Sequence, residues 1–218
     1  MTDLTLIQKI AVWALPLIFA ITLHEVAHGF VASLLGDQTA KLSGRLTINP
    51  VKHIDPIGTI LIPFVMLLVS NFIFGWAKPV PVDSRNLRNP RRDMALVALA
   101  GPVSNLLMAL FWGLIARLGI LADQSGSSWS GVPLVYMGGA GITINVVLAV
   151  LNFIPLPPLD GGRILEAVLP RRAAYSVSLV EPYGFYILIL LMMTGILSSI
   201  MSPFVYFIIN LIGNIVGL

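Results

Sequence analysis

Residues 10–35 read IAVWALPLIFAITLHEVAHGFVASLL, and this stretch decides the class of fold. Glu25 is the only Asp, Glu, Lys or Arg among its 26 residues. At a rise of about 1.5 Å per residue, a helix of this length crosses the roughly 30 Å hydrocarbon core of a bilayer. The stretch therefore predicts a transmembrane helix with a carboxyl group well below the membrane surface, where a charge is costly and usually functional.

The whole chain has the composition of an integral membrane protein. Of its 218 residues, 57% are hydrophobic and 11% are charged, and the mean hydropathy is +0.91. Soluble domains have about 25% charged residues, so a soluble enzyme, a nucleic-acid-binding module and a disordered chain are excluded. The small net charge of +3 needs no nucleic-acid partner, and the partner we expect is the lipid bilayer. The absence of cysteine excludes disulfides and thiol ligands.

Five apolar stretches are long enough to enter a bilayer: Ile10–Leu35, Ile57–Trp76, Met94–Leu121, Val132–Ile154 and Pro182–Leu218. The last is too long for one span, and Gly195 near its middle predicts two helices joined by a tight turn. We therefore expect an all-α polytopic membrane protein with about five transmembrane helices around a three-helix catalytic core. A single domain would cover residues 1–218, with its core at about 10–170 and a C-terminal helical hairpin at about 182–218.

Basic residues are unevenly distributed among the loops. Residues 36–56, 77–93 and 163–181 carry three, five and three Lys or Arg, whereas residues 122–133 carry none. Because basic loops favour the cytoplasmic side, we expect the amino terminus outside and the three basic loops inside. Residues 57–76 must then be a re-entrant segment, with a true span as the alternative. No transit segment is visible, which favours a prokaryotic cell membrane.

Two short stretches are typical of edge strands associated with the membrane surface. They are Leu46-Thr47-Ile48 and Pro79-Val80-Pro81-Val82. An exposed strand edge can hold a substrate backbone by strand addition. An ordinary loop is the alternative in both places.

The sequence His24-Glu25-Val26-Ala27-His28 predicts a metal site within the first apolar stretch. Histidines four residues apart lie on one face of a helix, so both rings can bind one ion. The pattern is typical of zinc sites in which the glutamate takes a proton from metal-bound water. The alternative is a buried His–Glu network that supports helix packing. The remaining histidine, His53, lies in a basic loop and is expected at the surface.

Asp160 is the candidate for a third protein ligand, which a zinc site normally has. It follows a stretch with three prolines and precedes Gly161 and Gly162, so the helix must break there. A broken helix inside a membrane is tolerated where it lines a cavity, and it can present a polar group. The alternative is that Asp160 caps the N-terminus of a helix over residues 161–169.

Amide and small side chains accompany these residues. Asn145 and Asn152 are two helical turns apart, so they share a face and are candidates to bind a substrate backbone. Helix packing is the alternative for both. Gly101, Asn105 and Ala109 recur at four-residue intervals, which favours close packing against a neighbouring helix.

Together these residues resemble the site-2 protease family of intramembrane zinc metalloproteases. The resemblance rests on the HExxH pattern at 24–28, on Gly101-Pro102…Asn105, and on Asn152…Pro155…Pro157…Leu159-Asp160-Gly161. It implies one Zn²⁺ per chain bound by His24, His28 and Asp160, water activation by Glu25, and substrate contacts from Asn152. The implied substrates are single-pass membrane proteins or peptides, cleaved in or near the transmembrane segment. The implied roles are regulated intramembrane proteolysis or clearance of signal-peptide remnants.

The chain departs from many members of that family in one respect. A substrate-filtering PDZ domain between the middle and later spans is replaced by the short loop 122–133. No nucleotide-sensing domain is visible after the last helix either, so regulation would fall to a separate partner protein. The alternative function from another class is a transporter or ion-conducting protein that uses the same His, Glu and Asp residues as a cation site.

Overall fold

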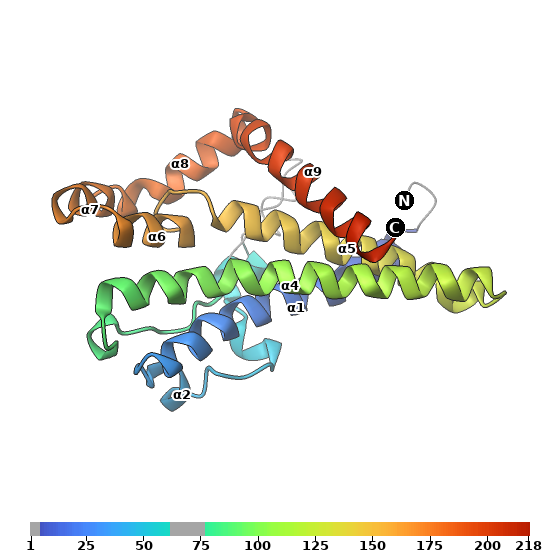
Figure 1. The fold of residues 1–218 in the computed structure, drawn as a ribbon, viewed down its shortest axis with the longest axis horizontal. Helices are drawn as coiled ribbons and strands as arrows, with labels where there is room; N and C mark the ends of the chain where they lie inside the picture. Colours follow the sequence, from blue (N-terminus) through green and yellow to red (C-terminus); the bar gives the residue numbers. More distant parts are fainter. Residues whose placement is uncertain (1–4, 62–76) are drawn as a thin grey trace.

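A computed structural model describes residues 5–61 and 77–218 of the chain (Figure 1). The long helices are α1 (Leu6–Leu34), α4 (Pro90–Gln124), α5 (Ser128–Asn152), α8 (Glu181–Met193) and α9 (Ile196–Val216). The shorter helices are α2 (Thr39–Leu42), η1 (Pro50–His53), η2 (Pro56–Leu61), η3 (Ser84–Asn86), α6 (Asp160–Val168) and α7 (Arg171–Ser178). Most of the predicted re-entrant segment 57–76 lies outside the described residues.

Four of these helices are long and apolar enough to cross a membrane: Ile7–Leu34, Pro90–Gln124, Ser128–Asn152 and Ile196–Val216. A fifth candidate is the pair α7 and α8, which are bent by 62° at a short break. Large apolar side chains point outward from several spans, including Phe30, Leu107 and Ile215, which are 52%, 64% and 63% exposed. Such outward-facing surface suits contact with lipid, and the predicted all-α polytopic fold is confirmed.

Helices α1, α4 and α5 form the three-helix core that the sequence predicts. Figure 1 shows the three running side by side along the long axis, and α4 packs against both of the others. Glycines make the α4–α5 contact close. A Cβ added at Gly138 would lie 2.5 Å from the Ala116 Cβ, and one at Gly141 would lie 2.1 Å from the Trp112 ring. Small residues at such contacts are the usual means of packing helices in membranes.

The C-terminal stretch forms the predicted pair of helices, α8 and α9. They meet at an apex away from α4 (Figure 1), and the turn is made by Gly195 at φ +73°, a left-handed conformation that glycine adopts without strain. Helix α9 packs back onto α4 and α5 through a buried apolar cluster, which Leu188 of α8 joins. The cluster contains Ala109, Trp112, Ile142, Val146, Val150, Leu188, Leu197, Met201 and Ile212.

The two stretches expected to be edge strands do not pair, and no strand occurs in residues 5–61 or 77–218. Residues 46–48 form a bend, and the carbonyl of Thr47 accepts a hydrogen bond from His53 Nε2 at 2.9 Å. His53 is therefore buried, at 2% exposure, and not at the surface as predicted. In the second stretch Pro79 and Pro81 have no N–H to contribute to a ladder.

Asp37 anchors the segment 77–89, which leads into α4. Its buried carboxylate accepts hydrogen bonds from the side chain of Thr39, the amide of Asn86 and the backbone N–H groups of Thr39 and Asp83. Burial alone would raise the pKa of Asp37, but these four hydrogen bonds outweigh burial and lower it. The carboxylate thereby fixes the end of this segment beside the C-terminus of α1.

Candidate active site

Helix α1 carries three of the predicted site residues on one face. The His24 and His28 rings are 4.6 Å apart between centroids and meet edge to face, and their Nε2 atoms are 3.0 Å apart. This is the arrangement expected from a four-residue spacing on a helix. Both rings are largely enclosed, with 12% of each side chain exposed.

The bend between α5 and α6 brings Asp160 to the same place. Gly161 and Gly162 let α6 begin directly against this bend. A Cβ at Gly161 would lie 2.3 Å from the carbonyl oxygen of Ile154, and one at Gly162 would lie 2.4 Å from the backbone nitrogen of Pro157. Asp160 Oδ2 lies 3.3 Å from His24 Nε2 and 3.4 Å from His28 Nε2. The N-cap position belongs to Leu159, so Asp160 does not cap α6.

The hydrogen bond of His28 fixes which ring nitrogen carries the proton. His28 Nδ1 lies 2.7 Å from the backbone carbonyl of Val97 on α4. A carbonyl oxygen only accepts hydrogen bonds, so Nδ1 must be protonated. The neutral ring then presents an unprotonated Nε2 toward Asp160.

A chain of two asparagines fixes His24 in the same way. Asn145 Nδ2 donates to the carbonyl of Gly141 at 2.9 Å, so its Oδ1 faces Asn105 Nδ2 at 3.0 Å. Asn105 Nδ2 also donates to the carbonyl of Ala20 at 3.2 Å, which leaves Asn105 Oδ1 to accept from His24 Nδ1 at 2.7 Å. In the neutral His24 ring, Nε2 is therefore the unprotonated nitrogen as well. Both asparagine side chains are fully buried, and the carbonyls of Ala20 and Gly141 fix the orientation of their amides.

Three lone pairs thus converge on one point from His24, His28 and Asp160. All three candidate ligand atoms lie within 4.8 Å of one another, and buried Asp160 Oδ2 has no hydrogen-bond donor among the described residues. Two ligands each about 2.1 Å from a tetrahedral centre are about 3.4 Å apart, close to the spacing found here. Two neutral imidazoles and one carboxylate therefore fit a divalent cation such as zinc in both donor type and geometry.

Glu25 lies beside these three residues without joining them. Its Oε2 accepts a hydrogen bond of 2.8 Å from the backbone N–H of Val80, in the segment that crosses α1. Arg45 holds that segment from the other side, because its guanidinium donates to the carbonyls of Lys78 and Pro79. The carboxylate is oriented by Val80, and it shares a cleft of about 250 Å³ with the three ligand candidates.

The two asparagines predicted to bind substrate lie in different places. Asn152 lines the cleft, and its Nδ2 donates to the carbonyl of Leu148 one turn earlier in α5. Asn145 is fully buried behind His24, and its amide is engaged by Asn105 and Gly141, so it does not face the cleft. Asn145 therefore supports the histidine through Asn105.

The positioning roles of Asn105, Val97 and Val80 are not among those predicted from the sequence. The sequence predicts a role in helix packing for Asn105. The signal for a functional role is its amide, which is a polar group four residues after Gly101 in an apolar span. The contacts of Val97 and Val80 use backbone atoms, which leave no signal in the sequence.

Replacing Asn105 with leucine is expected to lower zinc affinity by about 10- to 100-fold, because His24 loses the acceptor that orients its ring. Competition with a zinc-binding dye on the purified protein measures the change. Ser104→Ala is the matched control, since within the described part of the chain the Ser104 hydroxyl bonds only to the Gly101 carbonyl of its own helix. Equal affinities for Asn105→Leu and wild type would show that the amide does not orient the ligand.

Comparisons with known proteins find relatives over most of the chain. A profile described as peptidase family M50 matches residues 116–195, which include Asp160 but not the two histidines. The Bacillus subtilis (strain 168) protein "Putative zinc metalloprotease YwhC" is 41% identical over 189 residues, covering 86% of this chain and 82% of that protein. The Mycolicibacterium smegmatis protein "Putative zinc metalloprotease Rip2" is 27% identical over 201 residues, covering 90% of this chain and 72% of that protein.

A more distant relative is archaeal: "Zinc metalloprotease MJ0392" of Methanocaldococcus jannaschii is 25% identical over 204 residues, which cover 90% of this chain and 48% of that protein. No solved structure matches the chain.

A helical membrane core with two imidazoles, a carboxylate and an adjacent glutamate defines the class of membrane-embedded metallohydrolases. Within that class, the chain belongs to peptidase family M50 and is a zinc metalloprotease. The resemblance to site-2 proteases is thereby confirmed.

Proposed function

We propose that this protein is an intramembrane endopeptidase that hydrolyses a peptide bond in or near the transmembrane segment of a single-pass substrate. One Zn²⁺ per chain would be held by His24, His28 and Asp160, with Glu25 as the proton-transfer group. The observation that carries the proposal is the convergence of three lone pairs beside Glu25, between helices that are apolar enough to cross a bilayer. The domain is proposed to extend over residues 1–218.

The chain's own residues supply the remaining chemistry. When bound, zinc supplies a Lewis acid that polarises the scissile carbonyl and lowers the pKa of a coordinated water. Glu25 accepts a proton from the attacking water as its oxygen bonds to the carbonyl carbon, and it returns that proton to the amide nitrogen as the C–N bond breaks. Val80 keeps the carboxylate oriented through both steps. Asn152, at the wall of the cleft, is placed to hold the substrate backbone once its amide leaves Leu148.

The biological setting follows from charge and from the relatives. The basic loops are proposed to be cytoplasmic and the amino terminus outside, in a prokaryotic cell membrane, since the relatives named above come from bacteria and an archaeon. Substrates would be membrane-held regulators or remnant signal peptides. A separate protein would supply regulation.

Metal removal and restoration test the proposal. Purified protein in detergent is incubated with model single-pass peptides, and the fragments are mapped by mass spectrometry. We expect cleavage within or next to the transmembrane segment, a loss of roughly 100-fold or more after chelation, and recovery with about one equivalent of Zn²⁺ per chain. Mg²⁺ is the control ion and should not restore activity, because a site with two imidazoles disfavours it. Cleavage that survives chelation, or cleavage confined to the soluble tails, would contradict the proposal.

A further inference from the structure

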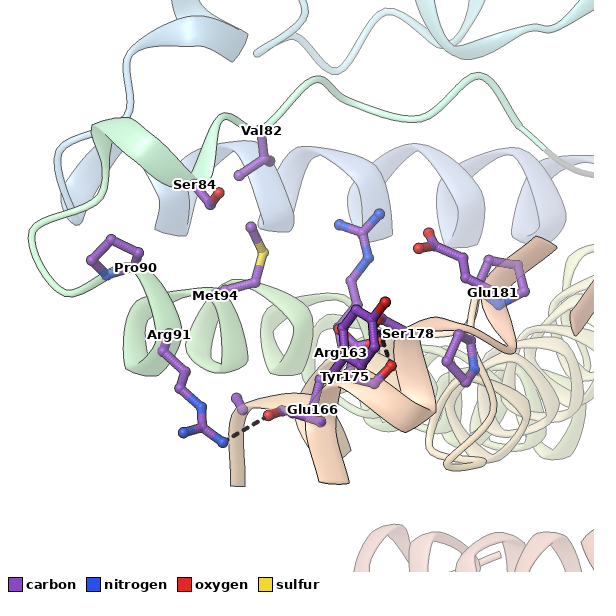
Figure 2. A pocket seen from close by; sticks show the side chains of 14 residues that line it. Val82, Ser84, Pro90, Arg91, Met94, Arg163, Glu166, Tyr175, Ser178 and Glu181 are labelled. Atoms are coloured by element: carbon purple, nitrogen blue, oxygen red, sulfur yellow. Dashed lines mark hydrogen bonds between the residues drawn. The ribbon is translucent and has the colours of Figure 1, made fainter. Parts of the chain in front are cut away.

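A second, larger cavity adjoins the cleft that contains the candidate metal ligands. Its volume is about 620 Å³, and its walls come from the segment before α4, the start of α4, the bend after α5, and helices α6, α7 and α8 (Figure 2). Val82, Pro158 and Arg163 line both this cavity and the cleft. The two spaces are therefore neighbours, and a chain leaving the cleft on this side enters the cavity.

The cavity lies on the side of the molecule that carries the basic loops, at the beginning of α4 and beside α7. Half of its lining is polar, unlike the outward surfaces of the spanning helices. The polar lining residues are Ser84, Arg91, Arg163, Glu166, Tyr175, Ser178 and Glu181. A transmembrane helix is apolar, whereas the residues that flank it are polar, so this lining suits a flank and not the span itself.

Arg163 presents an unsatisfied cation at the boundary between cleft and cavity. Within residues 5–61 and 77–218 its guanidinium makes no hydrogen bond or ion pair, while Arg91 donates to the backbone carbonyl of Glu166 at 3.1 Å. Figure 2 shows the two side chains diverging, with Arg163 extending from α6 toward α1. Arg163 lies three residues after Asp160, so the two share a face of α6.

Two carboxylates line the cavity outside the cleft. Glu166 and Glu181 line the cavity but not the cleft, and neither forms an ion pair within the described ranges. Burial and the negative charge of Glu181 raise the pKa of Glu166, and the positive charge of Arg163 opposes them without cancelling the rise. Beyond the cleft, the cavity thus carries two carboxylates and one cation, Arg91, whose guanidinium bonds to the backbone carbonyl of Glu166.

We propose that this cavity binds, as an extended chain, the polar flank of the substrate on the side of the basic loops. Arg163 donates to backbone carbonyl oxygens next to the cleaved bond, and Glu166 and Glu181 pair with a Lys or Arg further along the flank. This inference rests on the proposed intramembrane protease function. The expected residue class follows from membrane topology, because cytoplasmic flanks of transmembrane segments are enriched in Lys and Arg.

Changing the charges of the enzyme and of the substrate flank tests the proposed role of Glu166 and Glu181. Three single-pass peptides share one membrane segment and carry Lys-Lys, Gln-Gln or Glu-Glu in the flank, and they are cleaved in a neutral detergent. For wild type, kcat/KM should be about three- to tenfold higher for the Lys-Lys than for the Glu-Glu peptide, mainly through KM. In Glu166→Gln/Glu181→Gln the difference should disappear, whereas Asp123→Asn, at the far end of α4, should keep it. Equal rates for all three peptides in wild type, or an unchanged preference in the double variant, would overturn the proposal.

Photo-crosslinking tests occupancy of the cavity without cleavage. A photoreactive amino acid replaces Tyr175 in the cavity or, as a control, Tyr206 on α9, in a Glu25→Gln background; the two tyrosines are 66% and 67% exposed. The Lys-Lys peptide should be captured through its flank from position 175 and not from position 206. Equal capture of the peptide at positions 175 and 206, or no capture at position 175, would contradict binding of the flank in the cavity. If the peptide is captured at position 175 but wild type does not cleave it, the proposed protease function alone is refuted. If wild type cleaves the peptide but position 175 does not capture it, only the proposed role of the cavity is refuted.

Discussion

Replacing Glu25 with glutamine is expected to leave zinc bound and to lower the rate of peptide-bond cleavage by about 10²- to 10⁴-fold. The glutamine side chain has nearly the same size, and its carbonyl oxygen can still accept the 2.8 Å hydrogen bond from Val80. Its amide cannot accept a proton from water. The three candidate ligand atoms belong to His24, His28 and Asp160, so the metal site does not need the Glu25 charge.

Two measurements on the same preparation decide this prediction. Elemental analysis gives the zinc content per chain, and mass spectrometry gives the rate of cleavage of a single-pass peptide. Asp123→Asn removes one negative charge away from the cleft and should resemble wild type in both. Loss of zinc in Glu25→Gln would identify Glu25 as a ligand, as a cation carrier would use it. Full activity with zinc present would remove Glu25 from the reaction.

The part of the site that was predictable from sequence is the part set by local geometry or by ligand chemistry. His24 and His28 were paired by helical spacing alone, and the structure places their Nε2 atoms 3.0 Å apart. Asp160 is 132 residues beyond His28, yet the shortage of ligands and the proline-glycine break identified it. Helical spacing and the number of ligands that zinc requires do not depend on how the helices pack, so no tertiary information was needed.

The contacts that were not predictable depend on the rotation of one helix against another. Asn105 meets His24 only because α4 turns that face toward α1, and spacing of small residues indicates close packing without fixing which side chain meets which. His53 was expected at the surface because of its basic neighbours, but a bend places its ring against the Thr47 carbonyl. The predicted strands at 46–48 and 79–82 failed for a related reason, since a strand needs a partner that local sequence does not specify.

Gly101→Ala is expected to disable the metal site through a single methyl group. A Cβ at this position would lie 2.5 Å from His24 Cε1 and 2.5 Å from both Cε1 and Nε2 of His28. Neither ring can retreat easily, because Asn105 holds the Nδ1 of one and the Val97 carbonyl holds the Nδ1 of the other. Displacing the rings by about 1 Å would cost roughly 100-fold in activity, and overpacking would cost about 1–3 kcal/mol of stability.

Zinc affinity, cleavage rate and thermal unfolding of the variant, all in one detergent, separate these effects. Gly139→Ala on α5 and Gly213→Ala on α9 are matched controls, since an added Cβ at either meets nothing within 4 Å among the described residues. In those positions alanine also favours the helix, so stability should be equal or slightly higher. If Gly101→Ala binds zinc and cleaves as well as these controls, then α4 does not press on the histidines as described. A loss of zinc affinity that Gly139→Ala and Gly213→Ala do not share would mean that the close approach of the Gly101 backbone sets the positions of both imidazoles.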